Sequence, residues 1–206
     1  MTITYSVNRS LYVNLTNRCP CSCVFCIRNN ADGVYESGPL WLEREPTAQE
    51  VFDSILARDA GEFDELVFCG YGEPTERLDC LLDVARRVRE ARPNLKIRLN
   101  TNGLSDLINS RPTAGELKGL VDTVSVSLNT PDASEYVRLC RPKFGASSWQ
   151  AMIDFARACV ASVPDVVLSI VGEPVTSREK EEECRIIANS VGATLRVRKY
   201  EGALPK

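Results

Sequence analysis

Short apolar runs alternate with amphipathic stretches along most of the chain. Runs of four to eight apolar residues predict strands, and apolar positions at helical spacing predict helices. The expected strands are residues 11–15, 65–69, 95–99, 122–128, 165–171 and 193–200. The expected helices are residues 51–60, 77–92, 114–120, 148–162 and 177–191.

Local signals mark several of the helix ends. Thr47 and Glu50 have the spacing of a capping box ahead of the first expected helix. Ser177 is a plausible cap for the last expected helix. Pro93 and Pro164 follow two of the other helices, at places where a helix has to stop.

This alternation of strands and helices predicts an α/β fold with a parallel sheet. An open doubly wound sheet and a barrel are both compatible with the pattern. A full eight-stranded barrel takes about 250 residues, whereas this chain has 206 residues and six expected strands. A partial (β/α)6 TIM-like barrel therefore fits better than a full one, within a single domain of residues 1–206. Both architectures place functional residues at the carboxyl ends of the strands.

Composition narrows the class of protein. Hydrophobic residues are 44% and charged residues 26% of the chain, which is enough for a folded core. The net charge of −3 gives no sign of the basic face that general nucleic-acid binding needs. We expect neither a signal peptide nor a membrane span, since no apolar run approaches about 18 residues. The expected location is the cytoplasm.

The cysteine content points to metal chemistry. The chain has nine cysteines and no histidine, so a metal site has to rely on thiolates, which favour zinc or iron–sulfur clusters. Four of the cysteines lie within eight residues, in RCPCSCVFC at 18–26. We expect the other five to be packing residues: Cys69, Cys80, Cys140, Cys159 and Cys184.

Three metal sites are compatible with the cysteine-rich segment. A zinc site or a complete electron-transfer cluster would use four thiolates. The third alternative uses only Cys19, Cys23 and Cys26, in a Cys-x3-Cys-x2-Cys spacing with Phe25 before the last cysteine. Three thiolates on a four-iron cube leave one iron open, and an open position distinguishes a catalytic metal from a structural one.

Other polar segments follow the later strands. CGYGEP at 69–74 places Glu73 at the expected rim, and its glycines Gly70 and Gly72 would allow the backbone to approach a ligand closely. In NTNG at 100–103, Asn100 and Asn102 share one face of an extended chain. Ser125, Ser127 and Asn129 similarly share a face of the fourth expected strand.

Taken in order, these motifs resemble those of the radical SAM superfamily. The resemblance implies a partial barrel of the radical SAM type, with a 4Fe–4S cluster on Cys19, Cys23 and Cys26. It also implies that S-adenosylmethionine binds the open iron and is cleaved reductively to a 5′-deoxyadenosyl radical. Cys21 departs from the pattern, and we expect it to be a bystander.

The resemblance further implies a set of cofactor-binding residues. Residues 70–74 resemble the segment that holds the methionine ammonium group, with Tyr71 in place of a glycine and its side chain expected to point away. Ser127 resembles a position near the ribose or carboxylate, and Val171 one near the adenine. The complete set is Phe25, Gly70, Tyr71, Gly72, Glu73, Asn100, Asn102, Ser127 and Val171. Arg138, Arg141, Lys199 and Tyr200 remain candidates without a role, and no acid–base residue is assigned.

Within the superfamily, YVNLTNRC, CVFCIRNN and LWLEREPTAQEV are similar to the TatD-linked radical SAM proteins. That resemblance implies a TatD-type hydrolase as a partner, an unknown small-molecule substrate, and an electron donor such as flavodoxin or ferredoxin. Other functions stay open: an activase that makes a glycyl radical on a partner protein, a zinc-binding interaction module, and an iron–sulfur electron carrier.

Overall fold

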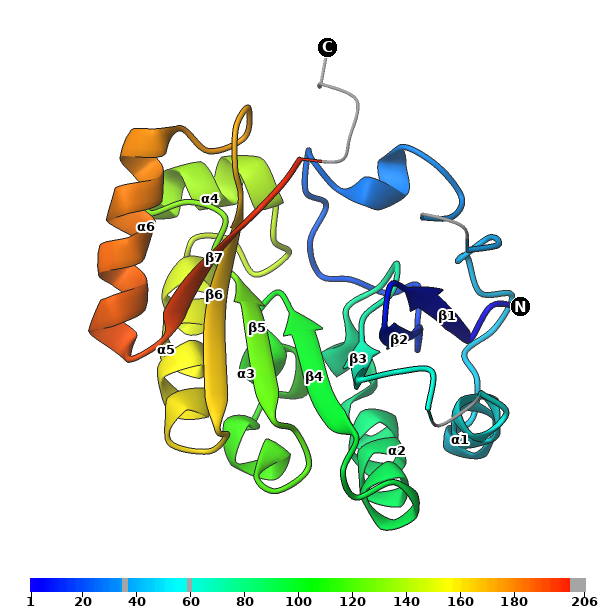
Figure 1. Ribbon diagram of the computed structural model, residues 1–206. Coiled ribbons are helices and arrows are strands. Elements are labelled where there is room, and N and C mark those ends of the chain that lie inside the picture. Colours follow the sequence, from blue (N-terminus) through cyan, green and yellow to red (C-terminus); the bar gives the residue numbers. More distant parts are fainter. Residues whose placement is uncertain (35–36, 59–60, 201–206) are drawn as a thin grey trace.

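A partly closed sheet organises the molecule (Figure 1). The computed structural model describes residues 1–34, 37–58 and 61–200. In this part of the chain the sheet has seven strands, in the order β1 to β7. They are β1 Thr4–Val7, β2 Ser10–Val13, β3 Glu65–Phe68, β4 Lys96–Thr101, β5 Thr123–Ser127, β6 Asp165–Val171 and β7 Thr194–Arg198.

The strand pairing confirms the expected fold class. β1 pairs with β2 in antiparallel fashion, and every later neighbouring pair is parallel. The six parallel strands β2 to β7 form the partial (β/α)6 barrel, and β1 adds an antiparallel edge that the sequence analysis did not anticipate. β1 and β7 are the two edges of the sheet order.

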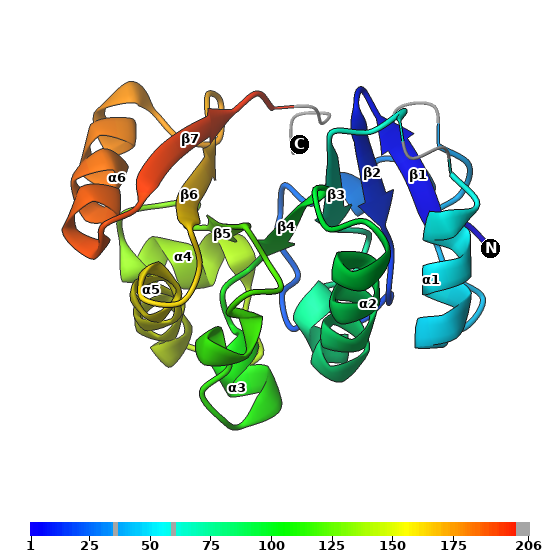
Figure 2. The same cartoon turned by 60° about the horizontal axis from the view of Figure 1, so that its bottom comes forward.

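The helices cover the outer face of the sheet, on one side in Figure 2. They are α1 Ala48–Leu56, α2 Leu78–Ala91, α3 Ser105–Asn109, α4 Ala133–Cys140, α5 Ser147–Val160 and α6 Arg178–Val191. Buried residues of the outer strand face, including Leu99, Val124 and Leu168, belong to one core with Val88, Phe155 and other helix residues. Burial of this apolar surface is the main force that holds the helices to the sheet.

Some expected elements differ from the observed ones. Residues 114–120 form only a short 3₁₀ turn at Ala114–Leu117, and α3 and α4 were not expected as helices. The capping box of Thr47 and Glu50 is confirmed, because both reciprocal hydrogen bonds are present. Ser177 occupies the N-cap of α6, but its side chain makes no capping hydrogen bond. No helix in the described ranges is long and apolar enough to cross a membrane.

Candidate active site

The cysteine loop, residues 19–26, lies at the carboxyl edge of the sheet after β2. Its backbone is hydrogen-bonded to the end of α4: Ser22 N donates to Cys140 O at 3.0 Å and Val24 N to Leu139 O at 2.9 Å. These bonds hold the cysteine loop against a packed helix, although α4 is more than a hundred residues away in the sequence. A helix-supported loop of this kind positions its side chains better than a free one.

Exposure separates the four thiols of this loop. Cys21 is buried, with 3% of its surface exposed, and it belongs to the apolar core. Cys19, Cys23 and Cys26 are each partly exposed. The three thiols of the Cys-x3-Cys-x2-Cys spacing are therefore the accessible ones.

The thiols also influence one another electrostatically. A hydrogen bond with Cys21 is the main cause that lowers the pKa of Cys19, and bonds from Cys140 and Cys21 lower the pKa of Cys23 to about 4. The same bonds raise the pKa of Cys21, and burial raises that of Cys26. The pKa values of two of the three accessible thiols are thus shifted toward the thiolate form, which is the form that binds metals.

Cys140 was expected to be a packing residue, and its side chain is indeed buried in the apolar core. Its buried thiol interacts with that of Cys23, and Asn129 Nδ2 lies 3.4 Å from Cys140 Sγ. Asn129, two residues after the end of β5, has a positive φ of 64°. Cys140 is far from the cysteine loop in the sequence, and the fold places its thiol beside the loop.

Glu73, which was expected at the rim of the sheet, is buried there, with 4% of its surface exposed. Its carboxylate accepts hydrogen bonds from Thr75 N and Oγ1 at 3.1 and 2.8 Å, from Thr101 Oγ1 at 2.7 Å, and from Asn102 N at 2.7 Å. Burial raises its pKa, and these donors oppose the rise. Glu73 therefore fastens the loop after β3 to the loop after β4.

The glycines of the same segment lie in close contact with the protein's own chain. A Cβ on Gly72 would lie 2.3 Å from Thr16 O, and one on Gly70 would lie 2.1 Å from Asn14 Oδ1. These glycines are needed because the segment packs directly on the chain that leads into the cysteine loop. Tyr71 between them is buried in a small cluster with Tyr5 and Leu40, and its hydroxyl donates to Ala31 O.

The remaining expected residues lie along the same edge. Asn102 Nδ2 is 3.9 Å from both Cys19 Sγ and Cys21 Sγ, so β4 ends beside the cysteine loop. Ser127 ends β5 and Val171 ends β6. Phe25 is partly buried against the core. Asn100 Oδ1 is buried without a hydrogen-bond partner.

The residues present fit a 4Fe–4S cluster and S-adenosylmethionine. The donor set is three accessible thiols on one loop, as a cube with one open iron requires. The unpaired acceptor on Asn100 is the kind of group that an ammonium or hydroxyl group of a ligand would satisfy. Among the described residues, no three His, Cys, Asp or Glu side chains are arranged to hold a single metal ion. A cube places each thiolate on a different iron and does not need that convergence.

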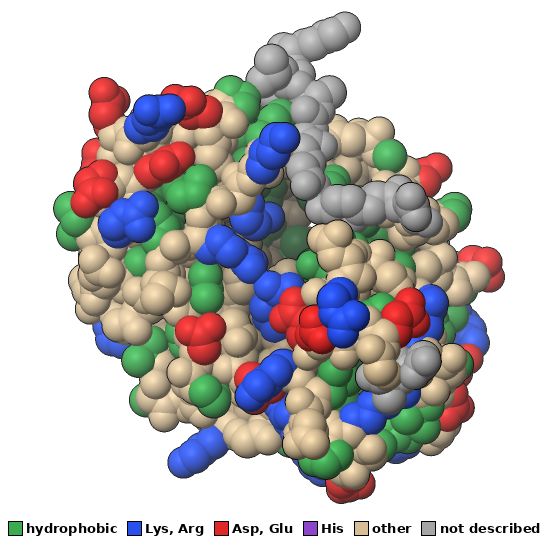
Figure 3. All heavy atoms as spheres, in the orientation of Figure 1, with side chains coloured by type: hydrophobic (Ala, Val, Ile, Leu, Met, Phe, Trp, Pro, Cys, Tyr) green, Lys and Arg blue, Asp and Glu red, His purple; other side chains and the backbone are tan. Residues whose placement is uncertain are grey.

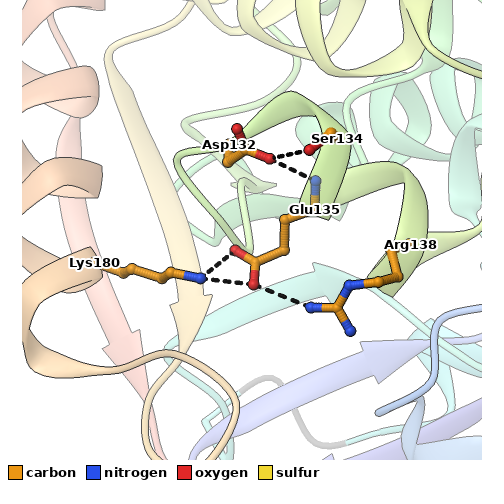
Figure 4. Close-up of a pocket in the computed structure, with 5 residues that line it drawn as sticks. All are labelled: Asp132, Ser134, Glu135, Arg138 and Lys180. Atoms are coloured by element: carbon orange, nitrogen blue, oxygen red, sulfur yellow. Dashed lines mark hydrogen bonds and ion pairs between the residues drawn. The ribbon is translucent and has the colours of Figure 1, made fainter.

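A surface cavity of about 460 Å³ lies apart from the thiols, between α4 and α6 (Figure 4). Glu135 accepts hydrogen bonds there from Lys180 at 2.6 and 2.7 Å and from Arg138 at 3.2 Å. Arg138, a candidate from the sequence, thus pairs with Glu135. These charges satisfy one another and hold α4 against α6, so we assign the chemistry to the cysteine loop. Arg141 and Lys199 are exposed and Tyr200 is half-buried.

Comparison with known proteins identifies the family. The model of the Radical SAM superfamily matches residues 13–186. GTP 3′,8-cyclase of Corynebacterium glutamicum is 33% identical over 141 residues, which cover 66% of this chain and 34% of that protein. The chain thus spans about a third of this curated relative.

Solved structures agree on the fold. A radical SAM methyltransferase from Sphaerobacter thermophilus has a TM-score of 0.67 at 22% identity and covers 95% of this chain and 57% of its own. TYW1 with a lysine-pyruvate adduct has a TM-score of 0.66 at 13% identity, covering 97% of this chain and 67% of its own. The FeFe-hydrogenase maturase HydG from Carboxydothermus hydrogenoformans also has a TM-score of 0.66, at 15% identity. The match covers 95% of this chain and 45% of the HydG chain.

The family match extends from β2 to α6 and includes every segment of the site described above. The chain therefore belongs to the radical SAM superfamily, whose members are enzymes that use a 4Fe–4S cluster and S-adenosylmethionine.

Proposed function

We propose that this chain cleaves S-adenosylmethionine reductively at a cluster held by Cys19, Cys23 and Cys26. One observation carries the proposal: the structure exposes these three thiols on a helix-supported loop and buries the fourth, Cys21. When bound, the cluster and S-adenosylmethionine would supply a 5′-deoxyadenosyl radical that takes a hydrogen atom from an unidentified small-molecule substrate.

The protein would bind and orient these groups. Phe25 supports the cysteine loop from the core side. Asn102 lies beside Cys19, and the unpaired Asn100 Oδ1 is offered to the cofactor from the same strand. Ser127 and Val171, at the ends of β5 and β6, would contact the ribose or carboxylate and the adenine.

The segment of residues 70–74 would act mainly through its backbone. Glu73 fixes its position relative to Asn102, and Gly70 and Gly72 allow it to pack on the chain before the cysteine loop. Tyr71 anchors the segment through its buried ring. The polar backbone groups so placed are the ones we expect at the methionine ammonium group.

Electron paramagnetic resonance tests the proposal. The protein is purified without oxygen, reconstituted with iron and sulfide, and reduced with dithionite, and spectra are recorded with and without S-adenosylmethionine. Cys23→Ala is the test variant. Cys80→Ala is the matched control, because Cys80 is a partly exposed cysteine on α2.

We expect a reduced 4Fe–4S signal that changes on addition of S-adenosylmethionine, is lost in Cys23→Ala and persists in Cys80→Ala. A signal that ignores S-adenosylmethionine would contradict the proposal and favour an electron carrier. Bound zinc with no cluster would favour an interaction module.

The proposal includes the setting of the enzyme. The resemblance to TatD-linked proteins supports a TatD-type hydrolase as partner, in the cytoplasm, with flavodoxin or ferredoxin as the electron donor and residues 1–206 as a single domain. Mixing the purified protein with a TatD-type hydrolase from the same genome and measuring association by calorimetry tests the partner. No heat of binding, and no effect of either protein on the other's activity, would contradict it.

A further inference from the structure

The inner face of the sheet is unusually polar. Residues two apart on a strand share a face, and the outward set, such as Ile97, Leu99 and Val126, is buried under the helices. The inward set therefore includes Arg98 and Asn100 on β4, Ser125 and Ser127 on β5, and Ser169 on β6, joined by the parallel register. Arg196 on β7 pairs with Ser169 in that register.

Positive charge dominates this face. Arg98 forms an ion pair with Glu65 at 2.8 Å, and Arg196 donates to Ser125 Oγ at 3.2 Å. Burial and the neighbouring charges of Arg98 and Arg198 lower the pKa of Arg196, and Tyr12 and Glu65 oppose them. Arg196 thus interacts there with two further guanidinium groups, and the carboxylate of Glu65 interacts with Arg98 and Arg196. Figure 3 shows Lys and Arg side chains gathered along the hollow of this face.

Two of these guanidinium groups have unused donors. The Nε–H groups of Arg98 and Arg196 are buried and make no hydrogen bond. The side chain of Arg98 is 13% exposed. A buried unpaired donor costs free energy, and it costs more when it belongs to a charged group. The Nε–H and one Nη–H of a guanidinium form a fork that matches the two oxygens of a carboxylate or phosphate.

We propose that Arg98 and Arg196 bind an oxyanion of the substrate, a phosphate or carboxylate group, inside the partial barrel. That this oxyanion belongs to the substrate of the radical reaction rests on the proposed function. Arg98 precedes Asn102 by four residues, a rise of about 13 Å along β4. The substrate would thus be anchored by its anionic end, with its reacting carbon nearer the cysteine loop.

Anion titrations test the proposal without the reaction. The reconstituted protein is titrated calorimetrically with sodium phosphate in one arm and sodium succinate in the other, against sodium chloride at equal ionic strength. We expect saturable binding of at least one oxyanion and none of chloride. The anion that binds more tightly identifies the group carried by the substrate.

Arg196→Gln is the main variant, because it removes one charge and leaves the Arg98–Glu65 pair intact. Arg98→Lys is the second variant, since it keeps the charge but loses the fork. We expect affinity to fall about tenfold or more in Arg196→Gln and to fall in Arg98→Lys. Arg157→Gln, at an exposed arginine on α5, is the control and should bind as the unmodified protein does.

Two results would overturn the proposal: no oxyanion binding above chloride, or equal binding by Arg196→Gln and the unmodified protein at unchanged melting temperature. Neither depends on S-adenosylmethionine. A protein that binds oxyanions through Arg196 but shows no cluster response would lose the proposed function and keep this site.

Discussion

Glu73→Gln isolates the carboxylate that joins the loops after β3 and β4. The substitution preserves the shape of the side chain and replaces one oxygen with an amide nitrogen. Three of the four hydrogen bonds converge on Oε1, and the fourth joins Oε2 to Asn102 N at 2.7 Å. The favoured orientation of glutamine keeps oxygen at the Oε1 position. Its NH₂ group then faces the Asn102 N–H group, donor against donor.

The expected loss is one hydrogen bond to a charged group, about 1.5–3 kcal/mol. In a chain of this size, 1 kcal/mol shifts the melting temperature by about 2–4 °C. We therefore expect the melting temperature to fall by about 3–12 °C. Removal of the buried negative charge of Glu73 stabilises the variant in part, so we expect a decrease toward the lower end of that range. Because Asn102 lies beside Cys19, we also expect weaker binding of S-adenosylmethionine.

Differential scanning calorimetry measures the first effect, and a titration of the cluster signal with S-adenosylmethionine measures the second. Glu90→Gln, at an exposed position on α2, is the control for loss of a glutamate. Equal melting temperatures and equal titrations for Glu73→Gln and this control would refute the role we assign to Glu73.

Three further outcomes follow from the same contacts. Gly72→Ala should lower the melting temperature, because its Cβ would overlap the backbone at Thr16, whereas Gly115→Ala meets no atom within 4 Å and should leave it unchanged or higher; thermal melts decide. Cys21→Ser should keep a cluster that responds to S-adenosylmethionine, whereas a protein without cluster would make Cys21 a ligand. Arg44 and Thr47 lower the pKa of Glu50 to about 2. The ionised Glu50 side chain therefore contributes fully to stability above the pKa of an unfolded glutamate, about 4.3, and this contribution is lost as the pH falls toward 2. Urea unfolding should show Glu50→Gln less stable at pH 7, with a difference that narrows below pH 4.5; a difference constant with pH would contradict this.

Regular patterns made much of the fold predictable. Each parallel strand carries apolar residues on the outer face that the helices bury, so all six strands were predicted from the sequence near their observed places. β1 did not, since its four residues, TYSV, carry too little apolar pattern to separate from a loop. α3 has five residues and α4 eight, which is also short for a periodic signal.

The site was predictable where its chemistry is local in sequence. The cysteine spacing and the position of NTNG after a strand need no long-range information. Contacts between residues far apart in the sequence could not be predicted from local motifs. Examples are the contact between the thiols of Cys140 and Cys23 and the hydrogen bond from Thr101 to Glu73. The inward position of Arg98 and Arg196 could not be predicted either. Alternation along a strand shows which residues share a face, but it does not show which face lies inside the barrel.

The central claim is that this chain cleaves S-adenosylmethionine, and product analysis tests it most directly. The reconstituted, dithionite-reduced protein is incubated with S-adenosylmethionine, and 5′-deoxyadenosine and methionine are quantified by chromatography with mass detection. The account predicts equal amounts of both products, formed by the unmodified protein and Cys80→Ala but not by Cys19→Ala, Cys23→Ala or Cys26→Ala. A protein with a complete, reducible cluster that leaves S-adenosylmethionine intact would contradict it.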